Sequence, residues 1–172
     1  MLIRRYKPED RETVRAIHAA AFRRPRDPAG TPAEVELLDR LIEAGDVIGP
    51  LSLVAVRQAG PVGHVVCSRA TTGGHPVAAL GPIAVHPEHQ RQGVGLAMMH
   101  AALAAADALE IPLVALLGSR DYYPRFGFVP AAQLAIESPD TGWGDDFQVR
   151  TLSAYHPRIT GRFRYAAAFD SV

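Results

Sequence analysis

The stretch between residues 77 and 99 does most to constrain how this chain folds, because it joins an extended apolar segment directly to a helical one. Val77 to Val85 is almost entirely apolar, with Gly-Gly before it and His86-Pro87 after it, which predicts a β-strand with defined ends. After it, apolar residues recur every three or four positions, at Val94, Met98, Ala101, Ala105 and Ala108. That spacing predicts a helix with one apolar face, and hence a strand–turn–helix unit.

The turn of this unit, Gln90-Arg91-Gln92-Gly93-Val94-Gly95, carries two glycines where the loop becomes helix. The first amides of a helix lack intrahelical partners, and the helix dipole adds partial positive charge there. Glycines let a bulky anion approach these amides, and Arg91 adds a full positive charge. The turn therefore predicts a phosphate-binding cradle. The alternative is structural, because G-x-G at a helix start also lets a helix pack closely against a strand.

A wider phrase around the turn is more specific, namely Ile83-Ala84-Val85-x-Pro87-x-x-Gln90-x-x-Gly93-x-Gly95. It resembles the acetyl-CoA signature of the GNAT superfamily of N-acetyltransferases, whose core pattern is Gln/Arg-x-x-Gly-x-Gly/Ala. Other phosphate-binding motifs fit poorly, since the chain has no Gly-Lys-Ser/Thr here and no third glycine three residues after Gly95. The resemblance implies direct transfer of an acetyl group from acetyl-CoA, as co-substrate, to a primary amine.

The same resemblance implies which residues bind the co-substrate. A strand segment would pair through its backbone with the pantetheine amides: Ile83, Ala84 and Val85. A turn segment would hold the pyrophosphate through its amides: Arg91, Gln92, Gly93, Val94, Gly95 and Leu96.

A second motif, Asp121-Tyr122-Tyr123-Pro124-Arg125-Phe126-Gly127-Phe128, follows a predicted strand at Ile111 to Leu117. It resembles the closing GNAT motif Tyr-x-x-x-Gly-Phe, which implies that Tyr123 is the general acid that protonates the departing thiolate. The unperturbed pKa values of a tyrosine and a thiol lie within about two units, so this proton transfer is not steeply uphill. The alternative is that both tyrosines only pack, and Tyr122 is expected to be structural.

The resemblance is closest to a bacterial subfamily often called YhbS-type predicted N-acetyltransferases, through Leu80 to Val85 and Tyr122 to Phe128. Weaker matches lie at Asp146-Phe147 and at Tyr165 to Phe169. One departure matters: many GNAT enzymes carry a glutamate on the fifth strand as general base, whereas Pro112 to Leu117 has no carboxylate. The base is unassigned, which leaves open a regulatory module that binds CoA without turnover.

The remaining patterns predict an α+β fold. The expected strands are Leu2 to Tyr6, Leu51 to Gln58, Val62 to Thr72, Phe147 to Leu152 and Phe163 to Phe169. Two further helices are expected: one from Pro8 to about Phe22, and one with a capping box of Thr31, Pro32 and Glu34 that ends at Gly45. The segment between them, Arg23 to Gly30, is predicted to be a loop. We expect one domain over residues 1–172, and the resemblance implies a central mixed, mostly antiparallel sheet of six to seven strands flanked by about four helices.

The charge balance and the residue spacing do not favour several other functions. Lys plus Arg equals Asp plus Glu, 18 each, so the formal charge is zero and does not favour binding to nucleic acid. A GNAT member that acetylates aminoacyl-tRNA is a third possibility, but it would need a basic face. No histidine or cysteine spacing is typical of a metal site.

The single cysteine, Cys67, lies in an apolar run and is expected to be a small core residue rather than a nucleophile. One cysteine cannot form an internal disulfide, and no apolar run reaches 18 residues. We therefore expect a cytoplasmic protein with no membrane partner. The acceptor amine is not identified by the sequence, although residues 22–50 and 131–160 should frame its pocket, and a homodimer is left open.

Overall fold

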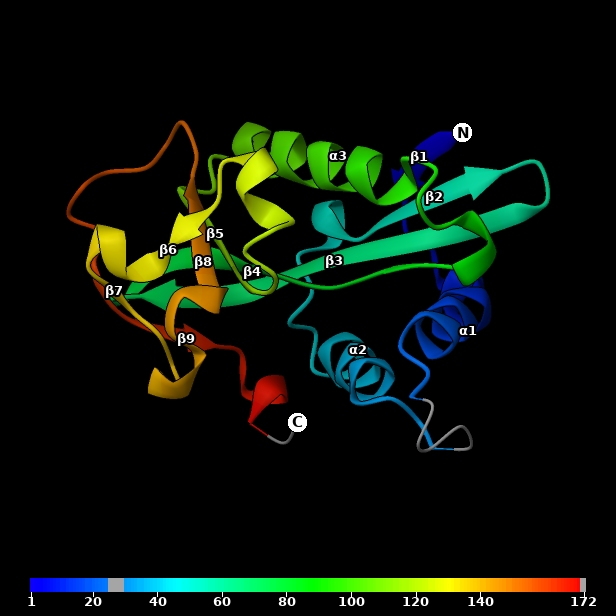
Figure 1. Cartoon of the computed structure of the whole chain (residues 1–172), viewed down its shortest axis with the longest axis horizontal. Coiled ribbons are helices and arrows are strands. Elements are labelled where there is room, and N and C mark those ends of the chain that lie inside the picture. The colour runs from blue at the N-terminus through cyan, green and yellow to red at the C-terminus, as the bar shows by residue number, and fades with distance from the viewer. Residues whose placement is uncertain (25–29, 171–172) are drawn as a thin grey trace.

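The computed structural model describes residues 1–24 and 30–170, and a mixed β-sheet of nine strands forms its centre (Figure 1). The strands are β1 (Leu2–Arg5), β2 (Leu53–Arg57), β3 (Gly60–Thr72), β4 (His75–Val85), β5 (Leu113–Leu117), β6 (Val129–Pro130), β7 (Ile136–Glu137), β8 (Phe147–Thr151) and β9 (Gly161–Tyr165). The α-helices are α1 (Arg11–Ala21), α2 (Ala33–Glu43) and α3 (Val94–Ala108).

The strands follow the order β1-β2-β3-β4-β5-β8-β6, and β9 pairs with β3 and β7. Among the strand pairs of the described residues, only β4–β5 and β7–β9 are parallel, which confirms the predicted mixed, mostly antiparallel sheet of an α+β fold. Two strands, β6 and β7, exceed the predicted six to seven because each is only two residues long and leaves no readable alternation in the sequence. Within the described ranges, no helix has the length and apolar character needed to cross a membrane.

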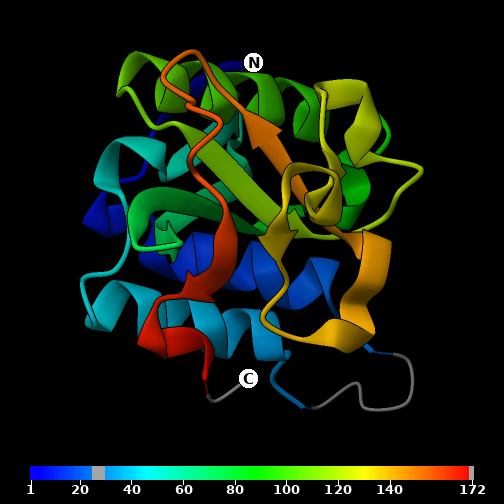
Figure 2. The same ribbon diagram turned by 90° about the vertical axis from the view of Figure 1, so that its left-hand side faces the viewer.

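The strands place their side chains alternately on two faces, which creates two cores. On β3, Val65 and Cys67 pack in the cluster that contains α3, whereas Val66 packs in the cluster that contains residues of α1 and α2. The same alternation on β5 sends Val114 and Leu116 toward α3. Figures 1 and 2 show the result, with α3 over one face of the sheet and α1 and α2 over the other.

The helix α3 begins at Val94 as predicted, but its buried face is turned from the predicted one. Val94 and Met98 are buried, whereas Ala108 is exposed. Four residues outside the predicted stripe complete the buried face: Met99, Ala102, Leu103 and Ala106. Alanine and other apolar residues occupy nearly every side of this helix, so hydrophobicity alone could not distinguish the core-facing stripe.

Two further predictions were wrong at the ends of elements. The capping box at Thr31 does not form, because Pro32 is extended (ψ 142°) and α2 begins at Ala33. This places Glu34 in the first turn of α2. The predicted strand to Phe169 stops at Tyr165, and a 3-10 turn follows at Ala167–Phe169. Of the loop predicted over residues 23–30, positions 25–29 lie outside the described residues.

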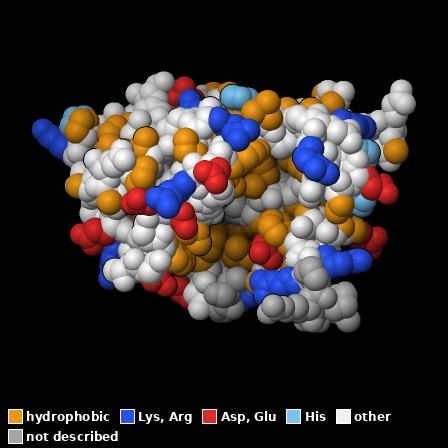
Figure 3. All heavy atoms as spheres, in the orientation of Figure 1, with side chains coloured by type: hydrophobic (Ala, Val, Ile, Leu, Met, Phe, Trp, Pro, Cys, Tyr) orange, Lys and Arg blue, Asp and Glu red, His pale blue; other side chains and the backbone are white. Residues whose placement is uncertain are grey.

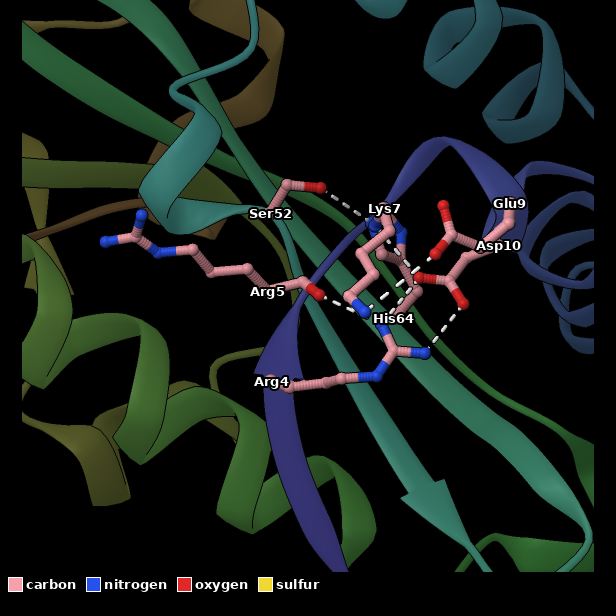
Figure 4. A network of polar contacts seen from close by, with 7 residues as sticks. All are labelled: Arg4, Arg5, Lys7, Glu9, Asp10, Ser52 and His64. Atoms are coloured by element: carbon pink, nitrogen blue, oxygen red, sulfur yellow. Dashed lines mark hydrogen bonds and ion pairs between the residues drawn. The ribbon is translucent and has the colours of Figure 1, made fainter.

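A polar cluster joins the N-terminal strand to the first helix (Figure 4). Pro8–Asp10 forms a 3-10 turn, so α1 starts at Arg11 rather than at Pro8. The Asp10 carboxylate accepts two hydrogen bonds from the Arg4 guanidinium (2.7 and 2.8 Å) and one from the Lys7 backbone amide (2.9 Å). The hydrogen bond from Arg4 holds the pKa of Asp10 below its usual value. These contacts fix the path of the chain from β1 into α1.

A second buried cluster lies beside it, between α1 and β3. His18 Nε2 is 3.0 Å from His64 Nδ1, and His64 Nε2 is 3.0 Å from Ser52 Oγ. Both imidazole rings are fully buried. Burial lowers the pKa of His18 to about 4, and burial together with the nearby His18 lowers that of His64 to about 3. Both rings are therefore neutral at pH 7.

Candidate active site

The parallel strands β4 and β5 separate after two residue pairs. They pair only at Ala78–Val114 and Ala79–Ala115 within the described chain. At this point β4 also carries one residue more than its other neighbour, since Val65 of β3 faces Ile83 whereas Cys67 faces Leu80. This bulge bends β4 away from β5, as bulges do. Gly81 and Pro82 lie within it, and Pro82 has no amide hydrogen to donate.

A cavity of about 920 Å³ opens where the two strands separate. Residues Leu80 to Ile83 of β4 line one side, and Leu117 and Tyr123 line another. The far end is formed by α2 and by segments late in the chain. Figure 3 shows the hollow at the centre of this face, with hydrophobic side chains on its walls and charged side chains of both signs near its rim.

A second cavity, of about 520 Å³, lies at the N-terminus of α3. It is lined by Ile83, Val85, Gln90, Arg91, Gly93, Gly95, Leu96, Tyr122 and Arg125. Ile83 lines both cavities, so the two adjoin along β4. A ligand that extends from the first cavity into the second would therefore meet the N-terminus of α3 and two arginines, Arg91 and Arg125.

The turn before α3 is held open by its own glutamines. The Gln90 side-chain amide donates to the Val85 carbonyl (3.0 Å). The Gln92 amide donates to the Glu88 carbonyl (2.9 Å), and its oxygen accepts from Arg57 (2.6 Å). Gly93 then adopts a left-handed conformation (φ 80°) as the helix N-cap, which side chains other than glycine rarely adopt.

These features fit a pyrophosphate. A Cβ added at Gly95 would lie 3.2 Å from the Tyr122 hydroxyl, so glycine keeps the helix N-terminus open to a bulky group. The partnerless first amides of α3 and the guanidinium groups of Arg91 and Arg125 supply donors and positive charge.

Six of the nine residues predicted to bind the co-substrate line the second cavity: Ile83, Val85, Arg91, Gly93, Gly95 and Leu96. The other three do not line either cavity. Ala84 and Val94 are buried in the core, and the Gln92 side chain is used within the turn. Successive side chains of a strand point to opposite faces, so Ala84 points into the core while its neighbours Ile83 and Val85 line the second cavity.

The two adjacent tyrosines face different cavities. Tyr123 lines the large cavity, and Tyr122 lines the one at the helix N-terminus. Their rings meet edge to face, with centroids 5.1 Å apart. Burial, with the nearby Tyr122, raises the pKa of Tyr123 to about 12, so its hydroxyl stays protonated at neutral pH. Tyr122 was expected to be structural, but its hydroxyl lies close to Gly95.

Several residues of the site were not predicted from the sequence, among them Arg125, Glu34 and Trp143. Arg125 lines the smaller cavity and lies 4.9 Å above the Tyr122 ring centroid. Its position between Tyr123 and Gly127 of the Tyr-x-x-x-Gly-Phe motif was the feature of the sequence that could have indicated that it belongs to the site. Glu34 and Trp143 line the large cavity, and only the tertiary structure brings them there.

Cys67 lines neither cavity. Its side chain is 1% exposed, and burial raises the pKa of its thiol to about 12. Among the described residues, no three histidine, cysteine or acidic side chains are grouped to hold a metal ion.

A family model described as the acetyltransferase (GNAT) domain matches residues 2–131. The chain belongs to the GNAT acetyltransferase family. This GNAT chain is 32% identical over 127 residues to the uncharacterized N-acetyltransferase YjhQ of Escherichia coli (strain K12), a match that covers 72% of this chain. The match covers 66% of YjhQ, slightly under two thirds of its length.

Two solved structures extend the GNAT likeness over almost the whole chain. A GNAT family acetyltransferase from Brucella melitensis, in complex with acetyl-CoA, is 30% identical with a TM-score of 0.78, covering 98% of this chain and 97% of that one. YhbS from Escherichia coli, in complex with CoA, is 26% identical with a TM-score of 0.87, covering 98% and 91%. The expected family and fold are confirmed.

Proposed function

We propose that this protein transfers an acetyl group from acetyl-CoA to the primary amine of an acceptor, by direct transfer. The observation that carries the proposal is that the two cavities adjoin along β4, where Ile83 lines both, at the place where β4 leaves β5. A ligand with a pyrophosphate at one end and a thioester at the other has this shape. Two GNAT structures of the same fold hold acetyl-CoA and CoA.

In this proposal the first amides of α3, with Arg91 and Arg125, bind the pyrophosphate. The pantetheine arm lies along Ile83 to Val85 like an added strand. Leu96 and Leu117 line the two cavities and are 45% and 46% exposed, so a bound arm would cover apolar surface that is otherwise in water.

Tyr123 is proposed to donate its hydroxyl proton toward the sulfur as the carbon–sulfur bond breaks. Its pKa of about 12 lies roughly three units above that of an unperturbed thiol, so full proton transfer in that environment would be uphill. The same burial also raises the pKa of the CoA thiol beside Tyr123, which narrows the difference between the two pKa values. A hydrogen bond that strengthens as charge develops on sulfur stabilises the transition state more than the ground state.

The test is Tyr123→Phe, assayed by acetyl-CoA-dependent thiol release with a panel of amines. We expect turnover to fall by about 10²–10⁴-fold, the usual contribution of a general acid, while acetyl-CoA affinity measured by calorimetry stays nearly unchanged. The aromatic ring remains, so the packing against Phe128 should hold.

Tyr122→Phe is the matched control, because it removes the same atom from the neighbouring residue at the other cavity. It should weaken acetyl-CoA binding modestly and leave turnover at saturation close to that of the wild type. If Tyr123→Phe turns over like the wild type, Tyr123 is a packing residue. If the wild type binds acetyl-CoA but releases no thiol with any amine, the protein is a CoA-binding module.

A further inference from the structure

The large cavity extends beyond Tyr123 into a chamber with an aromatic wall. Phe22, Trp143, Tyr165 and Phe169 line it. Tyr165 stacks on Phe169 with ring centroids 4.2 Å apart, and Trp143 meets Tyr165 edge to face at 6.1 Å. These ring contacts fix the aromatic side chains in place, so the wall is formed before a ligand binds. Such a surface binds flat or apolar groups, and aromatic faces also attract organic cations.

Glu34 is the half-buried acidic side chain in this chamber. It lies in the first turn of α2 and lines the cavity beside Ala33 and Leu37. Its Oε2 atom is buried and has no hydrogen-bond partner among the described residues. A buried carboxylate oxygen without a partner is costly, because its hydrogen bonds to water are lost and no hydrogen bond to the protein replaces them. A cationic hydrogen-bond donor in the chamber would relieve that cost.

Other charged groups also line the cavity, but they are exposed. Arg162 and Arg164 lie on β9, and Asp170 follows the turn after it. Exposed charges are screened by water and ions, so their effect on a ligand inside the chamber is weaker than that of Glu34. Arg162 and Arg164 are cationic and Asp170 is anionic, so the negative charge with a buried oxygen in the chamber is that of Glu34.

We propose that Glu34 binds the ammonium group of the acceptor and that the acceptor is a small primary amine with an apolar, aromatic body. This assignment rests on the proposed function for its place in the reaction. The ammonium group donates to Glu34 Oε2, and the body packs on the aromatic wall at Trp143 and Tyr165. The bound ammonium must pass one proton to Glu34 or to water before its nitrogen, then neutral, can attack the thioester carbonyl carbon. A cavity of about 920 Å³ is at the upper end of small-molecule sites, large enough for a thioester arm and a small acceptor together.

Trp143 makes the proposal directly measurable, since it is the one tryptophan of the chain and lies in the chamber wall. Its fluorescence can be titrated, with CoA present, with 2-phenylethylamine and with 2-phenylethanol, which has the same shape without the charge. We expect the amine to bind about tenfold or more tightly than the alcohol, the usual size of a charge-assisted hydrogen bond. Equal affinities for the two probes would overturn the proposal.

Glu34→Gln should remove this preference, weakening the amine about tenfold while leaving the alcohol unchanged. Glu36→Gln is the matched control: it removes the same charge from the same turn of α2, but Glu36 is exposed and paired with Arg40. Unchanged amine binding in Glu34→Gln would also overturn the proposal, and the comparison of the two probes on the wild type holds even if that variant fails to fold.

Binding and transfer give separate answers. If the charge preference is present and depends on Glu34, but no amine releases thiol from acetyl-CoA, the acceptor site stands and the proposed acetyl transfer fails. If thiol release occurs with other amines while 2-phenylethylamine and 2-phenylethanol bind alike, the transfer stands and the assignment of Glu34 fails.

Discussion

Gly118 shows how a residue without a side chain determines the position of Tyr123. It follows β5 directly, and a Cβ added there would overlap the Tyr123 ring. Its backbone is held on both sides, since its amide donates to the Asp146 carbonyl (2.9 Å) and its carbonyl accepts from the Gln148 side chain (2.8 Å). The backbone therefore cannot easily move aside, and the ring must move instead.

Gly118→Ala should accordingly displace Tyr123 and lower turnover, with a loss of stability of about 1–3 kcal/mol from overpacking. Acetyl-CoA affinity should change little, because Gly118 does not line the cavity at the helix N-terminus. The measurements are thiol release, calorimetry and the urea midpoint. Gly49→Ala is the control, since a Cβ at Gly49 meets open space. Full turnover in a folded Gly118→Ala protein would show that the exact ring position is unimportant.

At the scale of elements, the N-terminus of α3 is where the proposed pyrophosphate site depends on a local helix start. Gly95 belongs to the first turn, and space beside it is limited by Tyr122 and Val85. A carboxylate introduced here would occupy the anion site and repel its ligand, although negative charge near a helix N-terminus is otherwise favourable.

Gly95→Asp should therefore abolish measurable acetyl-CoA binding while leaving the protein folded. Calorimetry measures the affinity, and circular dichroism with a thermal melt reports the fold. Ala104→Asp is the control, because Ala104 is exposed in the middle of α3 and away from both cavities. Wild-type affinity in a folded Gly95→Asp variant would place the pyrophosphate elsewhere.

At the scale of the whole molecule, the buried pair His18 and His64 links the packing of α1 on the sheet to pH. In the unfolded chain both imidazoles have a pKa near the ordinary 6.5, whereas in the fold they titrate at about 4 and about 3. The unfolded state therefore binds more protons below pH 6.5. The free energy of unfolding must fall as pH decreases from 6.5 toward 4.

We expect this fall to be on the order of several kcal/mol between pH 7 and pH 4, and urea unfolding at a series of pH values measures it. Asp10 contributes little above pH 4, because its pKa in the fold is lowered and its unfolded form, with a pKa of 3.8, gains most of its protons near and below that pH. The double variant His18→Gln, His64→Gln should be less stable at pH 7 but show a much flatter profile. A wild-type profile that is flat from pH 7 to pH 4 would contradict the burial of the pair.

The sequence by itself determined the strand–turn–helix unit and the family, because these depend on short-range patterns: apolar runs, G-x-G at a helix start, and Tyr-x-x-x-Gly-Phe. Gly93 and Gly95 lie at the start of α3, where the pattern predicted the loop to become helix, since backbone freedom is a local property. The sequence also placed the ends of β2 and β3, and most other strand boundaries, within two residues. It failed at Thr31 and at the end of β9, where the local pattern was ambiguous.

Only the tertiary structure decided which side chains meet. Glu34 and Trp143 are more than a hundred positions apart, and no periodicity relates them, yet the sheet brings both to one cavity. The separation of β4 from β5 is likewise a property of two strands and a bulge rather than of either sequence alone. Tyr122 and Tyr123 are neighbours in the chain, but the fold alone sends one toward each cavity. Contacts between distant segments depend on how the whole core packs, which is why short-range patterns could not predict them.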